Sequence, residues 1–234
     1  MKKIIHRANQ RGHANHGWLD TYHTFSFASY YDPKHMGFGP LRVINEDRVS
    51  PGRGFGSHGH ADMEILTYVL SGALAHKDSM GHVETLHAND LQRISAGNGI
   101  VHSEFNGSEN EPVHFLQIWL EPAQNGLKPS YEQLSLTEQD KLGKLVPVAS
   151  PEGGGPLKIH QDARVFIGQV EAGKDLTHEL APRRKAWVHL IRGSAEVNGS
   201  PVQTGDAVAV TGESAVKIAG HAENSEVLVF DLAE

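Results

Sequence analysis

Gly54-Phe-Gly-Ser-His58-Gly-His60, together with Ser95-Ala-Gly-Asn-Gly-Ile-Val-His102-Ser-Glu104 later in the chain, decides the fold and the chemistry of this sequence. Each stretch holds two side chains that can bind a metal ion, and these lie two positions apart. On a β-strand this spacing directs both side chains to one face, with their Cα atoms roughly 6.5 Å apart. Two such pairs on facing strands can close around a single ion.

The segments around the two pairs carry strand and turn signals. The first pair leads into an apolar, β-forming segment from Glu64 to Gly72, and the second pair follows the turn residues Gly97-Asn-Gly99. Three imidazoles and one carboxylate suit a divalent ion such as Fe, Mn, Co, Ni, Cu or Zn, and are too rich in nitrogen for Mg or Ca. Four protein ligands on an octahedral ion leave two positions open, which is what a reactive site requires.

The composition limits the class of protein. The chain has 234 residues with 38% hydrophobic and 21% charged residues, and it contains no cysteine. Disulfides, thiolate metal sites and cysteine nucleophiles are therefore excluded. The net charge of −7 argues against a surface for nucleic acid or for an anionic membrane. The first residues lack the apolar core of a signal peptide, so the expected location is cytoplasmic.

Short β-forming segments separated by glycine turns run through the whole chain. They predict an antiparallel β-barrel or sandwich, with one short helix near residues 136–142. The expected strands cover residues 4–5, 23–33, 41–49, 64–72, 114–120, 163–170, 186–193, 194–198, 207–210 and 225–232.

A more polar region separates two halves of similar pattern. Residues 1–122 are expected to form a metal-binding barrel, residues 123–156 a linker with a short helix, and residues 157–234 a second barrel.

The second half reads as a repeat of the first when Gly193 is aligned with Gly72. That alignment sets Glu179 and Ala181 against the first histidine pair. The C-terminal barrel is therefore expected to lack metal ligands and to have a structural role.

Other histidines and aromatic residues are given ordinary roles. Three histidines fall near predicted turns and are expected to be exposed: His76, His82 and His87. Four aromatic residues are interpreted as core rather than pocket: Phe25, Phe27, Tyr30 and Phe38.

The order of strand, glycine turn and His-x-His, followed by a second histidine after another turn, resembles the two motifs of the cupin superfamily. Nearly the whole chain resembles bacterial pirin-like proteins of the bicupin class. The resemblance implies an all-β bicupin, with two antiparallel barrels of the double-stranded β-helix type and one or two short helices. One departure is Gly59, where the family usually has proline. The matching segments are His23-Thr-Phe-Ser-Phe, Tyr31-Asp-Pro, Met36-Gly-Phe-Gly, Leu41-Arg-Val-Ile-Asn-Glu-Asp, Asp62-Met-Glu-Ile-Leu-Thr-Tyr-Val-Leu and the two metal motifs.

The resemblance also implies a mononuclear metal centre with His58, His60, His102 and Glu104 as ligands. Fe(II) is the first expectation for the ion, with Mn, Ni, Co, Cu and Zn as alternatives. Glu64 is a rival carboxylate, because many other cupins use a glutamate shortly after His-x-His. On a continuing strand Glu64 would lie roughly 13 Å from His60, which favours Glu104.

For function, the resemblance implies a quercetinase-type dioxygenase that opens a flavonol ring with O2 and releases CO. Glu104 would then be the general base, and the partners would be a small aromatic enol or flavonol and O2, with no direct nucleic acid and no membrane. The alternative is a metal-containing, redox-sensing regulatory or binding protein without turnover, which would have a protein partner. A third interpretation is a cupin with a purely structural metal. A monomer is expected.

Overall fold

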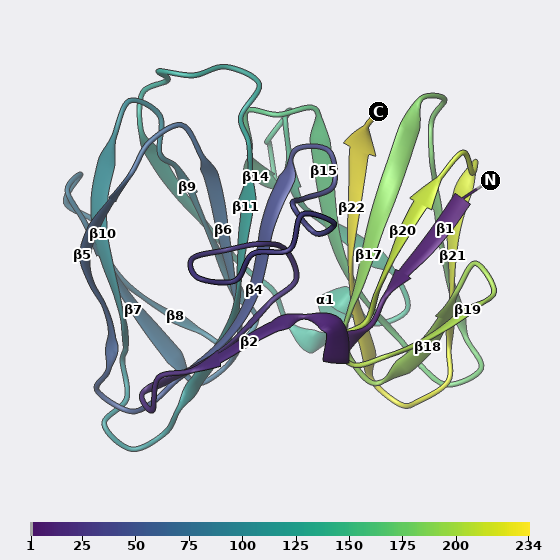
Figure 1. Ribbon diagram of the computed structural model, residues 1–234, viewed down its shortest axis with the longest axis horizontal. Coiled ribbons are helices and arrows are strands. Elements are labelled where there is room, and N and C mark those ends of the chain that lie inside the picture. Colours follow the sequence, from purple (N-terminus) through teal and green to yellow (C-terminus); the bar gives the residue numbers. More distant parts are fainter. Residues whose placement is uncertain (1) are drawn as a thin grey trace. The chain divides into compact units, whose positions relative to one another are not determined.

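The computed structural model describes residues 2–234, which fold almost entirely as β-strands and divide into two compact units (Figure 1). We call residues 11–135 with 157–161 the N-terminal barrel. The C-terminal barrel comprises the described residues up to Gln10, residues 136–156 and residues 162–234. Among the described residues, no helix is long and apolar enough to cross a membrane.

The N-terminal barrel contains two antiparallel sheets. The larger sheet has the order β12-β9-β6-β11-β4-β3-β2, and the smaller has the order β5-β10-β7-β8. A short strand, β14 (Leu157–Lys158), belongs to the same unit. The bounds of the other strands are β2 (Gly12–Asn15), β3 (Leu19–His23), β4 (Leu41–Val49), β5 (Gly54–His60), β6 (Glu64–Ser71), β7 (Ala73–Asp78), β8 (Val83–His87), β9 (Asp90–Ser95), β10 (Ile100–Asn106), β11 (Val113–Leu120) and β12 (Ser130–Ser135).

The C-terminal barrel repeats this plan. One sheet contains the order β1-β20-β17-β22-β15-β13, and the other has the order β16-β21-β18-β19. Two short helices lie in this unit, η1 (Ala8–Gln10) and α1 (Glu138–Lys141). The strands are β1 (Lys2–His6), β13 (Leu145–Ser150), β15 (Ala163–Val170), β16 (Asp175–Glu179), β17 (Arg184–Arg192), β18 (Ser194–Val197), β19 (Ser200–Gln203), β20 (Ala207–Thr211), β21 (Ala215–Gly220) and β22 (Ser225–Ala233).

The repeat inferred from the sequence is confirmed by equivalent turns. Gly72 and Gly193 both adopt positive φ, 80° and 88°, where the chain passes from a strand of one sheet to a strand of the other. A Cβ at Gly72 would approach the carbonyl oxygen of Pro112 to 2.6 Å, so that position requires glycine. Asp90 accepts a hydrogen bond from the backbone N–H three residues earlier, and Asp206 does the same.

The predicted strands are confirmed except near residues 23–33. β3 ends at His23, and the following segment is irregular, with an isolated bridge between Phe27 and Tyr30. Ser26 causes this, because its hydroxyl donates to the carbonyl of Asp32 and accepts from the N–H of Asp32, which closes a loop. The alternation of aromatic and polar residues there reflects a folded loop and not a strand.

The division into units differs from the limits expected at residues 122 and 157. β1 pairs with β20 along its whole length, so the first strand completes the C-terminal barrel. β12, expected to be part of a linker, pairs with β9 from Ser130↔Ser95 to Ser135↔Asp90 and serves the N-terminal barrel in the equivalent position. Each barrel thus takes its edge strand from a segment that the sequence pattern assigned elsewhere. The helix expected at 136–142 is α1, which has a capping box at Thr137 and Asp140.

An ion-pair cluster around the buried Glu46 of β4 joins Arg11, which precedes β2, to β4 and β11 in the N-terminal barrel. The carboxylate of Glu46 accepts from Arg11 at 2.8 Å, Arg48 at 2.9 Å and His114 at 3.0 Å. Burial alone would raise the pKa of Glu46, but the hydrogen bonds from His114 and Arg11 outweigh it and lower the pKa well below its ordinary value of 4.5. The ionised carboxylate therefore stabilises the fold.

Glu46→Gln is expected to lower the free energy of unfolding by about 2 kcal/mol at pH 7, because it weakens charge-assisted hydrogen bonds. A depressed pKa gives stability that is complete above pH 4.5 and is lost as the pH falls through the folded-state value. The difference between wild type and variant should therefore shrink below pH 4.5 in urea unfolding across a pH series. Glu84→Gln, at an exposed position on β8, is the control. A difference that stays constant with pH would contradict the ion-pair explanation.

Candidate metal centre

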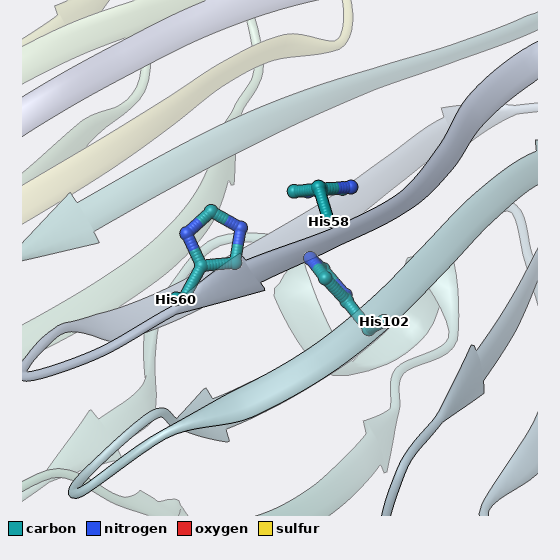
Figure 2. A group of neighbouring side chains, drawn as sticks. All are labelled: His58, His60 and His102. Atoms are coloured by element: carbon teal, nitrogen blue, oxygen red, sulfur yellow. The ribbon is translucent and has the colours of Figure 1, made fainter.

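Three histidines from two neighbouring strands converge inside the N-terminal barrel. His102 on β10 lies directly opposite His58 on β5, and Ile100 lies opposite His60. Ring nitrogens of the three histidines lie within 4.8 Å of one another. Figure 2 shows the two rings from β5 and the ring from β10 pointing toward a common space. The three predicted histidines thus lie together, whereas Glu104 forms a close group with His102 and His76 and not with His58 and His60.

The hydrogen bonding of these rings suits a metal ion. His58 Nδ1 lies 2.8 Å from the carbonyl oxygen of Gly56, so Nδ1 carries the proton and Nε2 keeps a free lone pair. His102 is 1% exposed, and neither of its ring nitrogens has a hydrogen-bond partner among residues 2–234. Unpaired buried nitrogens are costly unless something binds them. The donor set therefore fits a divalent transition metal.

Burial and the neighbouring histidines keep the rings of His60 and His102 in the neutral form. Burial, followed by the charge of His58, lowers the pKa of His60 to about 4. Burial, together with the neighbouring histidines, lowers the pKa of His102 to about 3. Both rings are neutral at pH 7, which is the form that binds a metal.

Glu104 shares the inner face of β10 with His102 and is 1% exposed. Its Oε1 accepts from Gln92 Nε2 at 2.6 Å, and its Oε2 accepts from Gln117 Nε2 at 2.9 Å. Burial raises the pKa of Glu104 to about 7, although the two amide hydrogen bonds act in the opposite direction. A carboxyl group poised near neutrality can both bind a metal and accept a proton.

The partners of Glu104 come from one row across the larger sheet. The strand register places Asn45, Gln117, Thr67 and Gln92 side by side on β4, β11, β6 and β9. The Thr67 hydroxyl donates to Gln117 Oε1 at 2.8 Å and accepts from Gln92 Nε2 at 3.0 Å, which orients both amides. Each of the four strands carries a polar residue at this position, but the sequence does not show that these residues align.

A cavity of about 220 Å³ opens beside the histidines. Polar groups of His58, His60, Glu104 and Gln117 line it. The full lining is Phe27, Asn45, Asp47, Phe55, His58, His60, Glu104, Gln117 and Trp119.

Three aromatic rings also line the cavity. Trp119 meets the ring of His60 edge-on at 5.0 Å and that of Phe27 at 5.3 Å. The expectation that Phe27 belongs to the core was therefore wrong: the loop after β3 carries it to the cavity, whereas Phe25 is buried with 1% exposure.

The rival carboxylate, Glu64, is held away from this cluster. It accepts from the Ser95 hydroxyl at 2.8 Å and lies 3.2 Å from His160 Nδ1. Among the described residues, Glu64 is in neither group of side chains close enough to share an ion.

His76 was expected to be exposed, and this was wrong, since it is 1% exposed. It lies opposite Glu104 on β7, and its side chain forms a second close group with His102 and Glu104. The sequence held a signal for this, because His76-Lys-Asp78 has the same two-residue spacing as the other two pairs. Of the other two, His87 is exposed and His82 is half-buried.

Comparison with known proteins identifies the family. The model of the Pirin family matches residues 5–120, and that of the quercetinase C-terminal cupin domain matches residues 147–232. Quercetin 2,3-dioxygenase of Escherichia coli strain K12 is 47% identical over 229 residues, which cover 97% of each chain. This chain belongs to the pirin family. The expected bicupin fold is thereby confirmed.

Solved structures of a bacterial pirin agree with this pirin-family fold. Two crystal structures of YhhW from Escherichia coli have TM-scores of 0.94 and are 46% and 45% identical. They match 99% of this chain, and 97% and 99% of their own chains. The second was solved in complex with nickel(II).

Asp47, whose carboxyl group lines the cavity, lowers the stability of the protein. Asp47 is 5% exposed, and its Oδ1 has no hydrogen-bond partner among residues 2–234. Burial raises its pKa to about 7 from an ordinary value of 3.8. A raised carboxyl pKa means that stability falls as the pH rises from about 4 to about 7.

Asp47→Asn is therefore expected to stabilise the metal-free protein by about 1–3 kcal/mol above pH 7, because it removes a buried charge. The gain should vanish below pH 4. Thermal and urea unfolding at pH 4, 6 and 8 measure it, with Asp20→Asn on β3 as a half-exposed control. A gain that does not depend on pH would contradict the assignment.

Proposed function

We propose that this chain is a metal-dependent dioxygenase of the quercetinase type, which opens a flavonol or related enolised ring with O2 and releases CO. The observation that carries the proposal is the cavity itself, which is lined by the imidazoles of His58 and His60, the Glu104 carboxyl and three aromatic rings. Aromatic walls suit a flat aromatic substrate, and a few polar groups in such a pocket fix its orientation. The similarity to a quercetin 2,3-dioxygenase over the whole chain supports the same reaction.

We propose His58, His60, His102 and Glu104 as the ligands of one divalent transition metal, with Fe(II) as the native ion. The nickel(II) complex of a bacterial pirin 45% identical to this chain supports a divalent metal. When bound, the ion would act as a Lewis acid that favours the deprotonated form of the substrate hydroxyl. Mn, Ni, Co, Cu and Zn suit the same donors.

In this proposal the protein's own groups orient the substrate and move its proton. Glu104 accepts the proton of the substrate hydroxyl, and the amides of Gln92 and Gln117 fix the carboxylate for that transfer. Phe27, Phe55 and Trp119 hold the ring plane and exclude water. The N–H of Trp119 is buried and has no partner among residues 2–234.

The cavity volume limits how the substrate enters. Pockets that enclose drug-sized ligands span roughly 300–1,000 Å³. The cavity of about 220 Å³ therefore holds the reacting part of a flavonol, with the remaining rings outside. A smaller enolised or catecholic compound would fit within it entirely.

The decisive measurement is CO release and O2 uptake when protein loaded with Fe(II), Mn, Ni, Co or Cu is given quercetin. We expect turnover with at least one metal and its loss in His58→Ala, because one of three imidazoles is removed. His87→Ala, an exposed histidine on β8, should retain full activity. Absence of CO with every metal, despite stoichiometric binding, would reject the dioxygenase and favour the regulatory alternative.

Glu104→Gln tests the base. General base catalysis contributes roughly 10²–10⁴-fold, so turnover should fall by about that factor, while quercetin binding by fluorescence titration should change much less. Glu64→Gln, at a buried carboxyl outside the cavity, is the matched control. Equal losses of binding and turnover in Glu104→Gln would reject the base role.

A further inference from the structure

A hydrogen-bonded group behind the metal centre is centred on Asp78 at the end of β7. Its carboxylate is fully buried. Oδ1 accepts from the backbone N–H of Met80 at 2.8 Å and of His82 at 3.1 Å. Oδ2 lies 3.1 Å from His76 Nε2 and 2.9 Å from His82 Nδ1. The His76 and His82 side chains and both N–H groups therefore converge on one carboxylate.

This arrangement fixes the tautomer of His76. An ionised carboxylate can only accept, so the proton of neutral His76 is on Nε2. Burial would raise the pKa of Asp78, but its hydrogen bonds outweigh burial and hold the pKa below its ordinary value. The hydrogen bond with His76 contributes most to this lowering. His76 Nδ1 consequently carries a lone pair and no proton.

That lone pair is buried and has no partner. His76 Nδ1 makes no hydrogen bond among residues 2–234, although the residue is 1% exposed. The ring forms a close group with His102 and Glu104, within 4.8 Å, and its centroid lies 5.5 Å from that of His102. An unpaired acceptor therefore belongs to a ring that lies next to His102 and Glu104.

His102, in turn, requires a hydrogen-bond acceptor. If one of its ring nitrogens binds a metal, the other carries a proton and requires an acceptor. Neither nitrogen has one among the described residues. His76, in the same close group, carries the lone pair that Asp78 leaves free. A hydrogen bond between the two rings requires one nitrogen of each to approach to about 3 Å.

We propose that His76 is a positioning residue whose Nδ1 accepts the ring N–H of His102, while Asp78 holds His76 in the required tautomer. A chain of hydrogen bonds from Asp78 through His76 to His102 then orients one metal ligand. This proposal rests on the metal site proposed above, but not on the reaction.

Stacking limits how far His76 can move. The ring of Tyr131 stacks on His76 at 4.9 Å and on His82 at 4.7 Å, with interplanar angles of 20° and 25°. The Tyr131 hydroxyl donates to Gln92 Oε1 at 3.2 Å, so the same ring also supports an amide that binds Glu104. Stacking on Tyr131 thus restricts the movement of the His76 ring.

Four variants separate orientation from packing. His76→Phe keeps a stacked ring without nitrogens. His76→Asn retains an acceptor near the Nδ1 position, and His82→Ala removes a partner of Asp78 without touching His76. Asp78→Asn is the sharpest change. Its oxygen can still accept both backbone N–H groups, but its NH2 then faces His76 Nε2 and moves the His76 proton to Nδ1, where it opposes the N–H of His102.

The readouts are the Ni(II) dissociation constant, by competition with a chromophoric chelator, and the EPR spectrum of the Cu(II)-loaded protein. We expect His76→Phe and Asp78→Asn to weaken Ni(II) binding roughly ten- to hundredfold, as loss of a partner behind a metal-bound histidine does, and to change the EPR spectrum. His76→Asn should lose clearly less, and His82→Ala should bind Ni(II) as wild type does. Thermal unfolding of the metal-free variants verifies folding.

Unchanged Ni(II) affinity in His76→Phe or Asp78→Asn would overturn the proposal while leaving the metal site intact. His76→Asn as weak as His76→Phe would also overturn it, as would a loss in His82→Ala equal to that in His76→Phe. Four coordinated imidazoles in wild-type protein would instead make His76 a ligand. Failure of wild-type protein to bind Ni(II) would reject the metal site itself, and this proposal with it.

Discussion

The enclosed carboxyl of Glu104 is the constraint on which the N-terminal barrel depends. A group of this kind is tolerated in a protein interior only when donors meet both oxygens. Here the donors are Gln92 and Gln117, on the sheet opposite β10. Because the side chains of a strand alternate between faces, a slip of one residue in β9 or β11 would turn either amide away. The carboxyl thereby fixes strand register as well as chemistry.

The same alternation brings the histidines to the cavity. Inward positions on β10 hold His102 and Glu104, and the matching positions on β7 hold Asp78 and His76. Polar and ionisable groups replace apolar packing along these rows, and Asp47 adds a carboxyl with an unpaired oxygen. The stability of the barrel must therefore come from the apolar positions elsewhere, such as the cluster around Leu74 and Phe115. The polar and ionisable groups around the candidate metal centre lower the stability of the barrel, as functional sites commonly do.

Much of this could be predicted from the sequence, because strand alternation and turn chemistry are local. The His58 and His60 pair, the strands and the repeat all follow from short-range spacing. Phe27 could not be assigned, because a side chain-to-backbone clamp at Ser26 replaces the strand that its pattern suggested. His76 was misjudged because proximity to a turn outweighed its spacing from Asp78. The edge strands β1 and β12 depend on partners far away in the chain, which no local pattern reveals.

The pairing of β1 with β20 also affects how the chain folds during synthesis. β1 is made long before its partner, so its backbone donors and acceptors stay open while most of the chain is added. Closing so large a loop is slow, and an open strand edge is a template for association with other chains. Lys2 and Lys3 place positive charge on this segment. Positive charge on an edge strand is one of the ways in which proteins discourage pairing with other chains.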